Sequence, residues 1–124
     1  TMIYFQTQRK ALWINADKDM LQQVFHNLLL NARQATDASV EPKIEIELEI
    51  EKGTVEIAIK DNGVGISAAQ QERIFTPYFT TKSSGSGIGL SVVRQIIEKH
   101  TGEIRFESKE GVGTIFYIGL NLVQ

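Results

Sequence analysis

The sequence predicts an α+β fold, specifically a two-layer α/β sandwich in which helices cover one face of a mostly antiparallel sheet. Three observations lead to this prediction. Segments 43–51 and 54–60 alternate apolar and polar residues, as strands with one solvated face do. Segments 18–36 and 90–100 carry apolar residues at helical spacing. These helices and strands do not alternate regularly, which argues against a parallel βαβ arrangement.

The size and composition of the chain fit a single domain, residues 1–124. Of its 124 residues, 42% are hydrophobic, which is enough for a two-layer core. The formal net charge of -2 and the scattered basic residues argue against nucleic-acid binding. The chain has no cysteine, which excludes disulfides, thiolate metal sites and cysteine nucleophiles. No apolar run approaches the ~20 residues of a membrane span, so we expect no direct membrane contact from this domain.

The N-terminal part predicts a strand followed by a long helix. Residues 11–15 (ALWIN) are typical of a short strand, and Asp17 or Asp19 can cap the helix that follows. We expect this helix to run from about Lys18 to Thr36. It carries an apolar stripe, as a helix packed on a sheet does. The stripe consists of Leu21, Val24, Leu28, Ala32 and Ala35.

The next segments predict an antiparallel strand pair. In 43–51 the apolar residues Ile44, Ile46, Leu48 and Ile50 alternate with four glutamates, and 54–60 repeats the pattern. Lys52-Gly53 between them predicts a two-residue hairpin turn.

The rest of the chain predicts two helices and two more strands. Segment 75–87 is rich in Thr, Ser and Gly without an apolar period, so we expect it to be mobile. Gly102 stands where a helix C-terminal cap belongs, and a glycine-rich turn at 111–113 joins the last strands. The elements are a short helix over 67–74, a helix over 90–100, and strands over 103–108 and 114–122.

Two asparagines four residues apart, Asn27 and Asn31, lie at the edge of the apolar stripe of the first helix. Magnesium prefers oxygen ligands, and the Asn31 amide oxygen adds no negative charge beside a polyanion. Asn27, one turn earlier, could hold a water or a phosphate oxygen. The alternative is that both are simply polar residues at a helix boundary.

The segment Asp61-Asn62-Gly63-Val64-Gly65 follows directly after a predicted strand. A carboxylate there can accept a hydrogen bond from the exocyclic amine of adenine, whereas guanine would present an oxygen. Gly63 and Gly65 let the backbone approach a flat ring closely. The alternative is a plain turn, since Asp-Asn-Gly is also a strong turn sequence.

The run Gly85-Ser86-Gly87-Ile88-Gly89-Leu90 opens the second long helix. It lacks the Gly-Lys-Ser/Thr of a P-loop and the strand-to-helix context of a dinucleotide-binding unit. The N–H groups at that helix N-terminus suit phosphate. Lys82 precedes the run and could bring a cation to the terminal phosphate. A flexible loop is the alternative.

These motifs, read in order, resemble the N, G1, F, G2 and Gly-x-Gly-Thr boxes of sensor histidine kinase catalytic domains. Such domains share the ATP-binding GHKL (Bergerat) fold with gyrase, HSP90 and MutL, and the F segment resembles the nitrogen-regulatory type of kinase. The resemblance implies a mixed sheet backed by about three helices, with ATP between the asparagine helix and a lid over about 76–89. The matching segments are NLLLNA, DNGVGI from Asp61, IFTPYFTTK from Ile74, GSGIGL from Gly85 and GVGT from Gly111.

The resemblance also implies a set of site residues. Mg²⁺ is coordinated by Asn31, adenine is recognised by Asp61 with Thr114 and a bound water, and Asn27 and Lys82 take part in catalysis. ATP is contacted by Asn27, Asn31, Asp61, Gly63, Gly65, Ile66, Lys82, Gly85, Gly87, Ile88, Gly89, Leu90 and Thr114.

The residue at the position of Asn27 distinguishes the members of this superfamily that hydrolyse ATP from those that transfer its phosphate. Members that hydrolyse ATP carry a glutamate at the matching position, where it activates water. An amide has no useful basicity, so we expect ATP hydrolysis to be slow. Transfer of the phosphate to a protein acceptor is then the reaction that remains. Many sensor kinases have Lys or Arg where this chain has Gln34, although Arg33 is adjacent and Lys82 could compensate.

The phosphoacceptor histidine of such kinases has a sequence context that neither His26 nor His100 shares. We expect His26 on the surface and His100 at a helix end, where a partial positive charge suits the dipole. The resemblance therefore implies the catalytic, ATP-binding domain of a longer histidine kinase, with residues 1–10 as a remnant of the linker from the dimerisation domain. Its partners would be that domain and a response regulator, in the cytoplasm, whether or not the parent is membrane-anchored. The alternatives are a degenerate ATP-binding regulatory module and a fragment of a GHKL ATPase.

Overall fold

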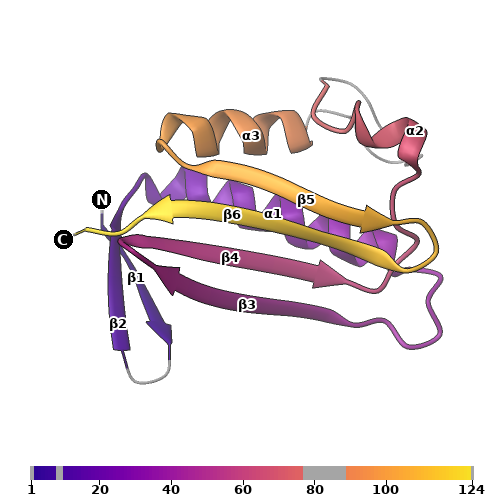
Figure 1. Ribbon diagram of the computed structural model, residues 1–124, viewed down its shortest axis with the longest axis horizontal. Helices are drawn as coiled ribbons and strands as arrows, with labels where there is room; N and C mark the ends of the chain where they lie inside the picture. Colours follow the sequence, from indigo (N-terminus) through magenta and orange to yellow (C-terminus); the bar gives the residue numbers. More distant parts are fainter. Residues whose placement is uncertain (1, 8–9, 77–88, 124) are drawn as a thin grey trace.

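The computed structural model describes residues 2–7, 10–76 and 89–123. Four strands form an antiparallel sheet in the order β3-β4-β6-β5, and β1 and β2 form a separate two-stranded sheet. Helix α1 lies behind the four-stranded sheet, and α3 runs beside its β5 edge (Figure 1). The predicted two-layer α+β sandwich is thus confirmed. In chain order the elements are β1 (Met2–Thr7), β2 (Lys10–Asn15), α1 (Lys18–Ala35), β3 (Ile44–Glu51), β4 (Thr54–Asp61), α2 (Ala68–Gln71), α3 (Gly89–Lys99), β5 (Glu103–Lys109) and β6 (Gly113–Asn121).

Helix α1 is the element that carries the two asparagines, and its ends agree with the sequence. The Asp17 carboxylate caps it by accepting from the Met20 backbone N–H at 3.0 Å. At the other end the Thr36 hydroxyl donates to the Ala32 carbonyl at 3.0 Å. The predicted stripe faces the core, with Ala35 half-buried and the other four residues buried: Leu21, Val24, Leu28 and Ala32.

The core lies between α1, α3 and one face of the sheet. Every second residue of β4 and β6 is buried, as expected for strands with one covered face. Fully burying an aliphatic side chain of this kind stabilises a fold by about 1.5–3 kcal/mol. The most deeply buried side chains include Ile14, Leu28, Val55, Ile59, Val93, Ile97 and Ile118. None of the helices in the described ranges combines the length and hydrophobicity of a membrane span.

Several expectations need correction. No strand was predicted before residue 11, whereas Met2–Thr7 forms strand β1 and pairs with β2. Every strand pairing in the described ranges is antiparallel, without the parallel component that "mixed" implies. The short helix covers only Ala68–Gln71. After α3 the left-handed residue is Thr101, with a φ of 58°, whereas Gly102 donates its N–H to the Ile97 carbonyl at 2.9 Å.

His100 joins the end of α3 to the start of α1. Its Nε2 accepts a hydrogen bond from the Asp17 backbone N–H at 3.0 Å, and its Nδ1 lies 2.8 Å from the Ile96 carbonyl oxygen. A ring nitrogen that accepts carries no proton, so Nδ1 bears the hydrogen and donates it to Ile96. His100 thus stands at a helix end, as expected, and its ring joins that end to the start of α1 through two backbone hydrogen bonds. His26 is exposed, as expected.

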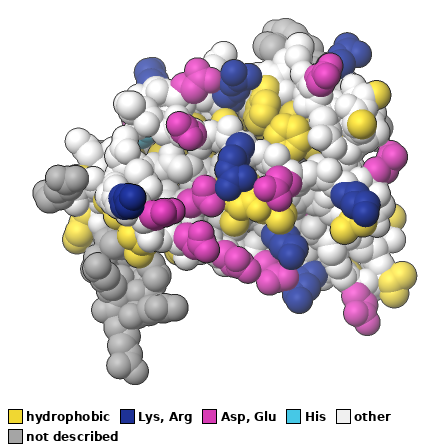
Figure 2. Space-filling view, viewed as in Figure 1, with side chains coloured by type: hydrophobic (Ala, Val, Ile, Leu, Met, Phe, Trp, Pro, Cys, Tyr) yellow, Lys and Arg dark blue, Asp and Glu magenta, His cyan; other side chains and the backbone are white. Residues whose placement is uncertain are grey.

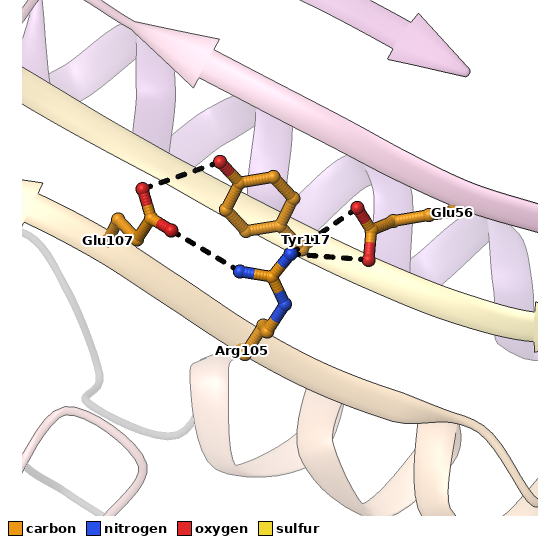
Figure 3. A network of polar contacts seen from close by, with 4 residues as sticks. All are labelled: Glu56, Arg105, Glu107 and Tyr117. Atoms are coloured by element: carbon orange, nitrogen blue, oxygen red, sulfur yellow. Dashed lines mark hydrogen bonds and ion pairs between the residues drawn. The ribbon is translucent and has the colours of Figure 1, made fainter. Parts of the chain in front are cut away.

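The other face of the sheet is covered with charged side chains (Figure 2). At its centre Arg105 lies over the Tyr117 ring, 3.8 Å from the guanidinium carbon to the ring centroid. Arg105 also lies 3.4 Å from carboxylate oxygens of Glu56 and Glu107, and the Tyr117 hydroxyl donates to Glu107 at 3.5 Å (Figure 3). The three charged side chains are solvent-exposed, so each ion pair contributes only about 0–1 kcal/mol to stability.

This cluster predicts an alkaline titration for Tyr117. Partial burial, together with the negative charges of Glu107 and Glu56, raises the pKa of Tyr117 above its usual value of 10.0, while Arg105 acts in the opposite direction. The unfolded chain therefore loses this proton first as pH rises past 10.0, and the fold loses the corresponding stability between that pH and the raised pKa. Ultraviolet titration of the phenolate should show a late step that is absent in Tyr117→Phe. Glu107→Gln should move that step to lower pH; an unmoved step would contradict the assignment.

Candidate functional site

The ends of two neighbouring strands place Asp61 and Thr114 side by side. Asp61 is the last residue of β4 and pairs directly with Thr114 of β6. Both side chains lie on the helix-covered side of the sheet, with only 6% and 4% of their surface exposed. One Asp61 carboxylate oxygen accepts from the Gly63 N–H at 2.9 Å. A buried carboxylate next to a buried hydroxyl is thus fixed at the start of the predicted glycine loop.

The loop that follows Asp61 is packed against the end of α1 and the β5–β6 turn. The Val64 N–H donates to the Ala35 carbonyl at 3.0 Å, and the Val64 carbonyl accepts from the Gly111 N–H at 2.8 Å. Gly63 sits so close to α1 that a β-carbon would lie 2.3 Å from the Ala35 oxygen. Gly65 has a φ of 71°. The segment 61–65 therefore forms more than an isolated turn, because hydrogen bonds and close packing join it to α1 and to the β5–β6 turn.

Two polar residues that sequence reasoning missed hold the far end of this loop. The Ser108 hydroxyl accepts from the Ile66 N–H at 2.8 Å and lies 2.8 Å from the Thr114 hydroxyl. Gln71 donates from its amide nitrogen to the carbonyls of Ile66 and Ser108, at 2.9 and 3.1 Å. Ile66, a predicted site residue, is thus joined through Ser108 to Thr114.

The two asparagines lie on α1 between this loop and the start of α3. Both are half-buried. The Asn27 amide nitrogen lies 3.5 Å from the Gly89 carbonyl oxygen, a long hydrogen bond that joins α1 to the first residue of α3. Asn31 is one turn further along α1, and Ala35, which contacts the loop, is one turn beyond that. Helix α1 thus connects the two regions that the sequence predicts to be functional.

The geometry along α1 suits an elongated ligand. Four residues of an α-helix rise about 6 Å along its axis, so Asn27, Asn31 and Ala35 lie at three successive levels along about 12 Å of α1. At the Ala35 level lie the Asp61 carboxylate and the Thr114 hydroxyl, which suit a hydrogen-bonding ring. At the Asn27 level lies the N-terminus of α3, whose dipole favours an anionic group. Gly89 and Leu90, both half-buried, begin that helix.

The remaining predicted residues cannot be placed in the same way. Lys82, Gly85, Gly87 and Ile88 lie outside the residues that the structure describes, as does most of the segment that we expected to be mobile. Within the described ranges no group of three or more His, Cys, Asp or Glu side chains could hold a metal ion. A metal at Asn31 would therefore depend on amide oxygen and on oxygens brought by the ligand.

An open hollow lies between α3 and β5, and none of the predicted site residues lines it. Arg94 lines it, 5.6 Å from the centroid of the Phe75 ring and 2.8 Å from the Glu98 carboxylate. Its ion pair is solvent-exposed. The hollow lacks the buried, convergent polar groups found near Asp61, so we do not assign a ligand to it.

Comparison with known proteins identifies a family model and solved structures that are similar to this chain. The family model described as "Histidine kinase-, DNA gyrase B-, and HSP90-like ATPase" matches residues 16–124. Among solved structures, the catalytic domain of histidine kinase ThkA is similar with a TM-score of 0.77 and 38% identity, covering 89% of this chain and 71% of that one. The mycobacterial sensor histidine kinase MprB is similar with a TM-score of 0.80 and 26% identity, covering 90% and 78%.

The curated relatives are histidine kinases too, and each is much longer than this chain. The sensor histidine kinase ZraS of Salmonella typhimurium is 47% identical over 112 residues, which are 89% of this chain and 23% of that protein. The signal transduction histidine-protein kinase AtoS of Escherichia coli is 45% identical over 104 residues, which are 83% of this chain and 17% of that protein. The chain thus spans about a quarter of the relatives it matches, or less.

Proposed function

The chain belongs to the family of histidine kinase-, DNA gyrase B- and HSP90-like ATPases, with a Bergerat fold like that of histidine kinase catalytic domains, and from this premise we propose its function. It binds ATP and transfers the γ-phosphate to a histidine on a separate dimerisation domain of the same parent protein. The observation that carries the proposal is the arrangement along α1, with a buried carboxylate and a buried hydroxyl at one end and a helix N-terminus at the other.

Adenine is held at the Asp61 end in this proposal. The Asp61 carboxylate has only acceptors to offer, so it suits the exocyclic amine of adenine and opposes the carbonyl of guanine. Thr114, opposite Asp61 in the sheet, adds a second polar contact, directly or through a water. Gly63, Gly65 and Ile66 form the backbone wall of this end, fixed to the end of α1 and to the β5–β6 hairpin.

The phosphates and Mg²⁺ lie nearer the Asn27 end. Asn31 offers a neutral oxygen, which fits the hard, oxygen-preferring Mg²⁺ when the nucleotide supplies further ligands. When bound, the ion would neutralise charge on the phosphates. The N–H groups of Gly89 and Leu90 at the α3 N-terminus suit the same anionic groups. Lys82, Gly85, Gly87 and Ile88 remain predicted contacts.

Asn27 supports transfer over hydrolysis. Its amide is held toward Gly89 at the start of α3, next to the proposed phosphate positions. An amide cannot accept a proton from water, so no general base is available from this residue. Positioning and charge neutralisation then carry the reaction, and a neutral imidazole of the acceptor domain is nucleophilic enough without a base.

The proposed partners follow from this chemistry. The domain works with its own dimerisation domain, and the phosphate passes on to a response regulator. We place it in the cytoplasm, where ATP is available. A regulatory module that binds ATP without transferring phosphate remains a second candidate, as does a fragment of a GHKL ATPase, which the amide at Asn27 disfavours.

Calorimetry followed by a transfer assay tests the proposal. The chain should bind a nonhydrolysable ATP analogue with Mg²⁺, and Asp61→Asn should weaken this binding by about 1–3 kcal/mol because a buried hydrogen-bonded charge is lost. With labelled ATP and a separately made dimerisation domain, an acid-labile phosphate should appear on histidine. Binding without transfer would favour the regulatory module, release of free phosphate would favour the ATPase, and no binding would overturn the proposal.

A further inference from the structure

The Ser108 side chain contacts both the glycine loop and Thr114. It is the sixth residue of β5 and pairs with Thr114 across the β5–β6 hairpin. Three polar groups surround its hydroxyl oxygen. They are the Ile66 N–H at 2.8 Å, the Gly113 carbonyl at 3.1 Å and the Thr114 hydroxyl at 2.8 Å.

The hydrogen bonds of Ser108 can be assigned because a hydroxyl has one proton and two acceptor sites. The Ile66 N–H can only donate, so it occupies one acceptor site of the Ser108 oxygen. The Gly113 carbonyl can only accept, so it takes the Ser108 proton. The remaining contact, to Thr114, must then be one in which Thr114 donates to Ser108. In this arrangement all three sites of the Ser108 hydroxyl are satisfied.

This assignment fixes the role of Thr114. The only proton of the Thr114 hydroxyl points to Ser108, so its remaining lone pairs are acceptors. Asp61, directly opposite in the β4–β6 pair, is also an acceptor. The two buried groups together form a pair of acceptors, which at position 6 of a purine favours an amino group with its two N–H donors and opposes a carbonyl oxygen.

We propose that Ser108 is a specificity-determining positioning residue: by accepting the Thr114 proton, it makes Thr114 an acceptor and so selects a 6-amino purine over a 6-oxo purine. The inference rests on the proposed ATP-binding function and adds to it. Ser108 acts through Thr114 and needs no contact of its own with the nucleotide. In the opposite arrangement Ser108 would donate to Thr114, which would free the Thr114 proton for a carbonyl and leave the Gly113 oxygen without this donor.

Binding of ATP and inosine triphosphate, which carries a carbonyl at position 6, tests the proposal. Calorimetry with Mg²⁺ gives the ratio of the two affinities for each variant. In Ser108→Ala the Thr114 proton is released and can be donated to the inosine carbonyl, so the preference for ATP should fall about 5- to 10-fold. Ser108→Thr keeps the hydroxyl and should retain the wild-type preference.

Gln71→Ala is the matched control for a loosened loop. Gln71 holds the same junction, through the Ile66 and Ser108 carbonyls, without touching the Thr114 hydroxyl. It should weaken both nucleotides by the same factor and leave their ratio within about twofold of wild type. Melting of the nucleotide-free variants shows whether each one folds. If Ser108→Ala does not fold, Ser108→Cys provides a similar shape with a much weaker hydrogen-bonding group and the same readout.

A double-mutant cycle tests whether Ser108 acts through Thr114. In the Thr114→Val background, removing the Ser108 hydroxyl should change the ratio no further. A ratio that stays at the wild-type value in Ser108→Ala, or that falls equally in both backgrounds, would overturn the inference while leaving ATP binding intact. Absence of ATP binding to the wild-type chain would instead remove the proposed function, and this inference with it.

Discussion

Replacing Asn31 by alanine should abolish phosphate transfer to the dimerisation domain. The amide oxygen of Asn31 is the protein ligand that we assign to Mg²⁺, and without it the ion and the phosphates it orients lose their fixed position. Alanine is a good helix former, so α1 should persist. The expected result is loss of labelled phosphohistidine above background, with an unchanged melting temperature in the absence of nucleotide.

Two measurements separate a metal role from general damage at Asn31. ATP binding with and without Mg²⁺ should differ strongly in the wild-type chain and little in Asn31→Ala. Gln23→Ala is the matched control, since Gln23 is an exposed amide on the same helix, and it should transfer normally. An unchanged transfer rate in Asn31→Ala would remove the metal assignment.

The fold was predictable where the pattern is local. The alternation of 43–51 and 54–60 is strict, and the pair forms with the expected two-residue turn, in which Lys52 and Gly53 both have positive φ. Strand β1 was missed because the chain between β1 and β2 contains no glycine, asparagine or aspartate, the usual signals of a hairpin turn. The hydrogen bond that joins His100 to the start of α1 could not be predicted either, since its partner Asp17 is 83 residues away in sequence.

The residues of the candidate site also differ in whether a local sequence pattern identifies them. Asp61 and Gly63 stand out because a carboxylate and glycines follow a strand, which is a local signal. Ser108 and Gln71 carry no such signal, since their role depends on strand register and on where α2 lies relative to β5. A sequence therefore identifies the groups that face a ligand more readily than the groups that orient them. The latter become visible only when the strands are aligned.

Replacing Gly63 by alanine should strongly disrupt the glycine loop. The added β-carbon would lie 2.3 Å from the Ala35 oxygen, which is backbone at the end of α1 and cannot rotate away. The loop must move, and the hydrogen bond from Val64 to Ala35 stretches or breaks. Overpacking and the lost bond together should cost about 2–4 kcal/mol of unfolding free energy.

Gly111→Ala separates this steric effect from backbone strain. Gly111 has a φ of 81° but no atom within 4 Å of an added β-carbon, so alanine there should cost only about 1 kcal/mol. Denaturant unfolding measures both variants. Because Asp61 binds the Gly63 N–H, a displaced loop also displaces the carboxylate, so Gly63→Ala should lose at least about tenfold in ATP affinity, whereas Gly111→Ala should bind normally. Equal stability losses in the two variants would contradict close packing of the loop on α1, since strain alone would then account for both.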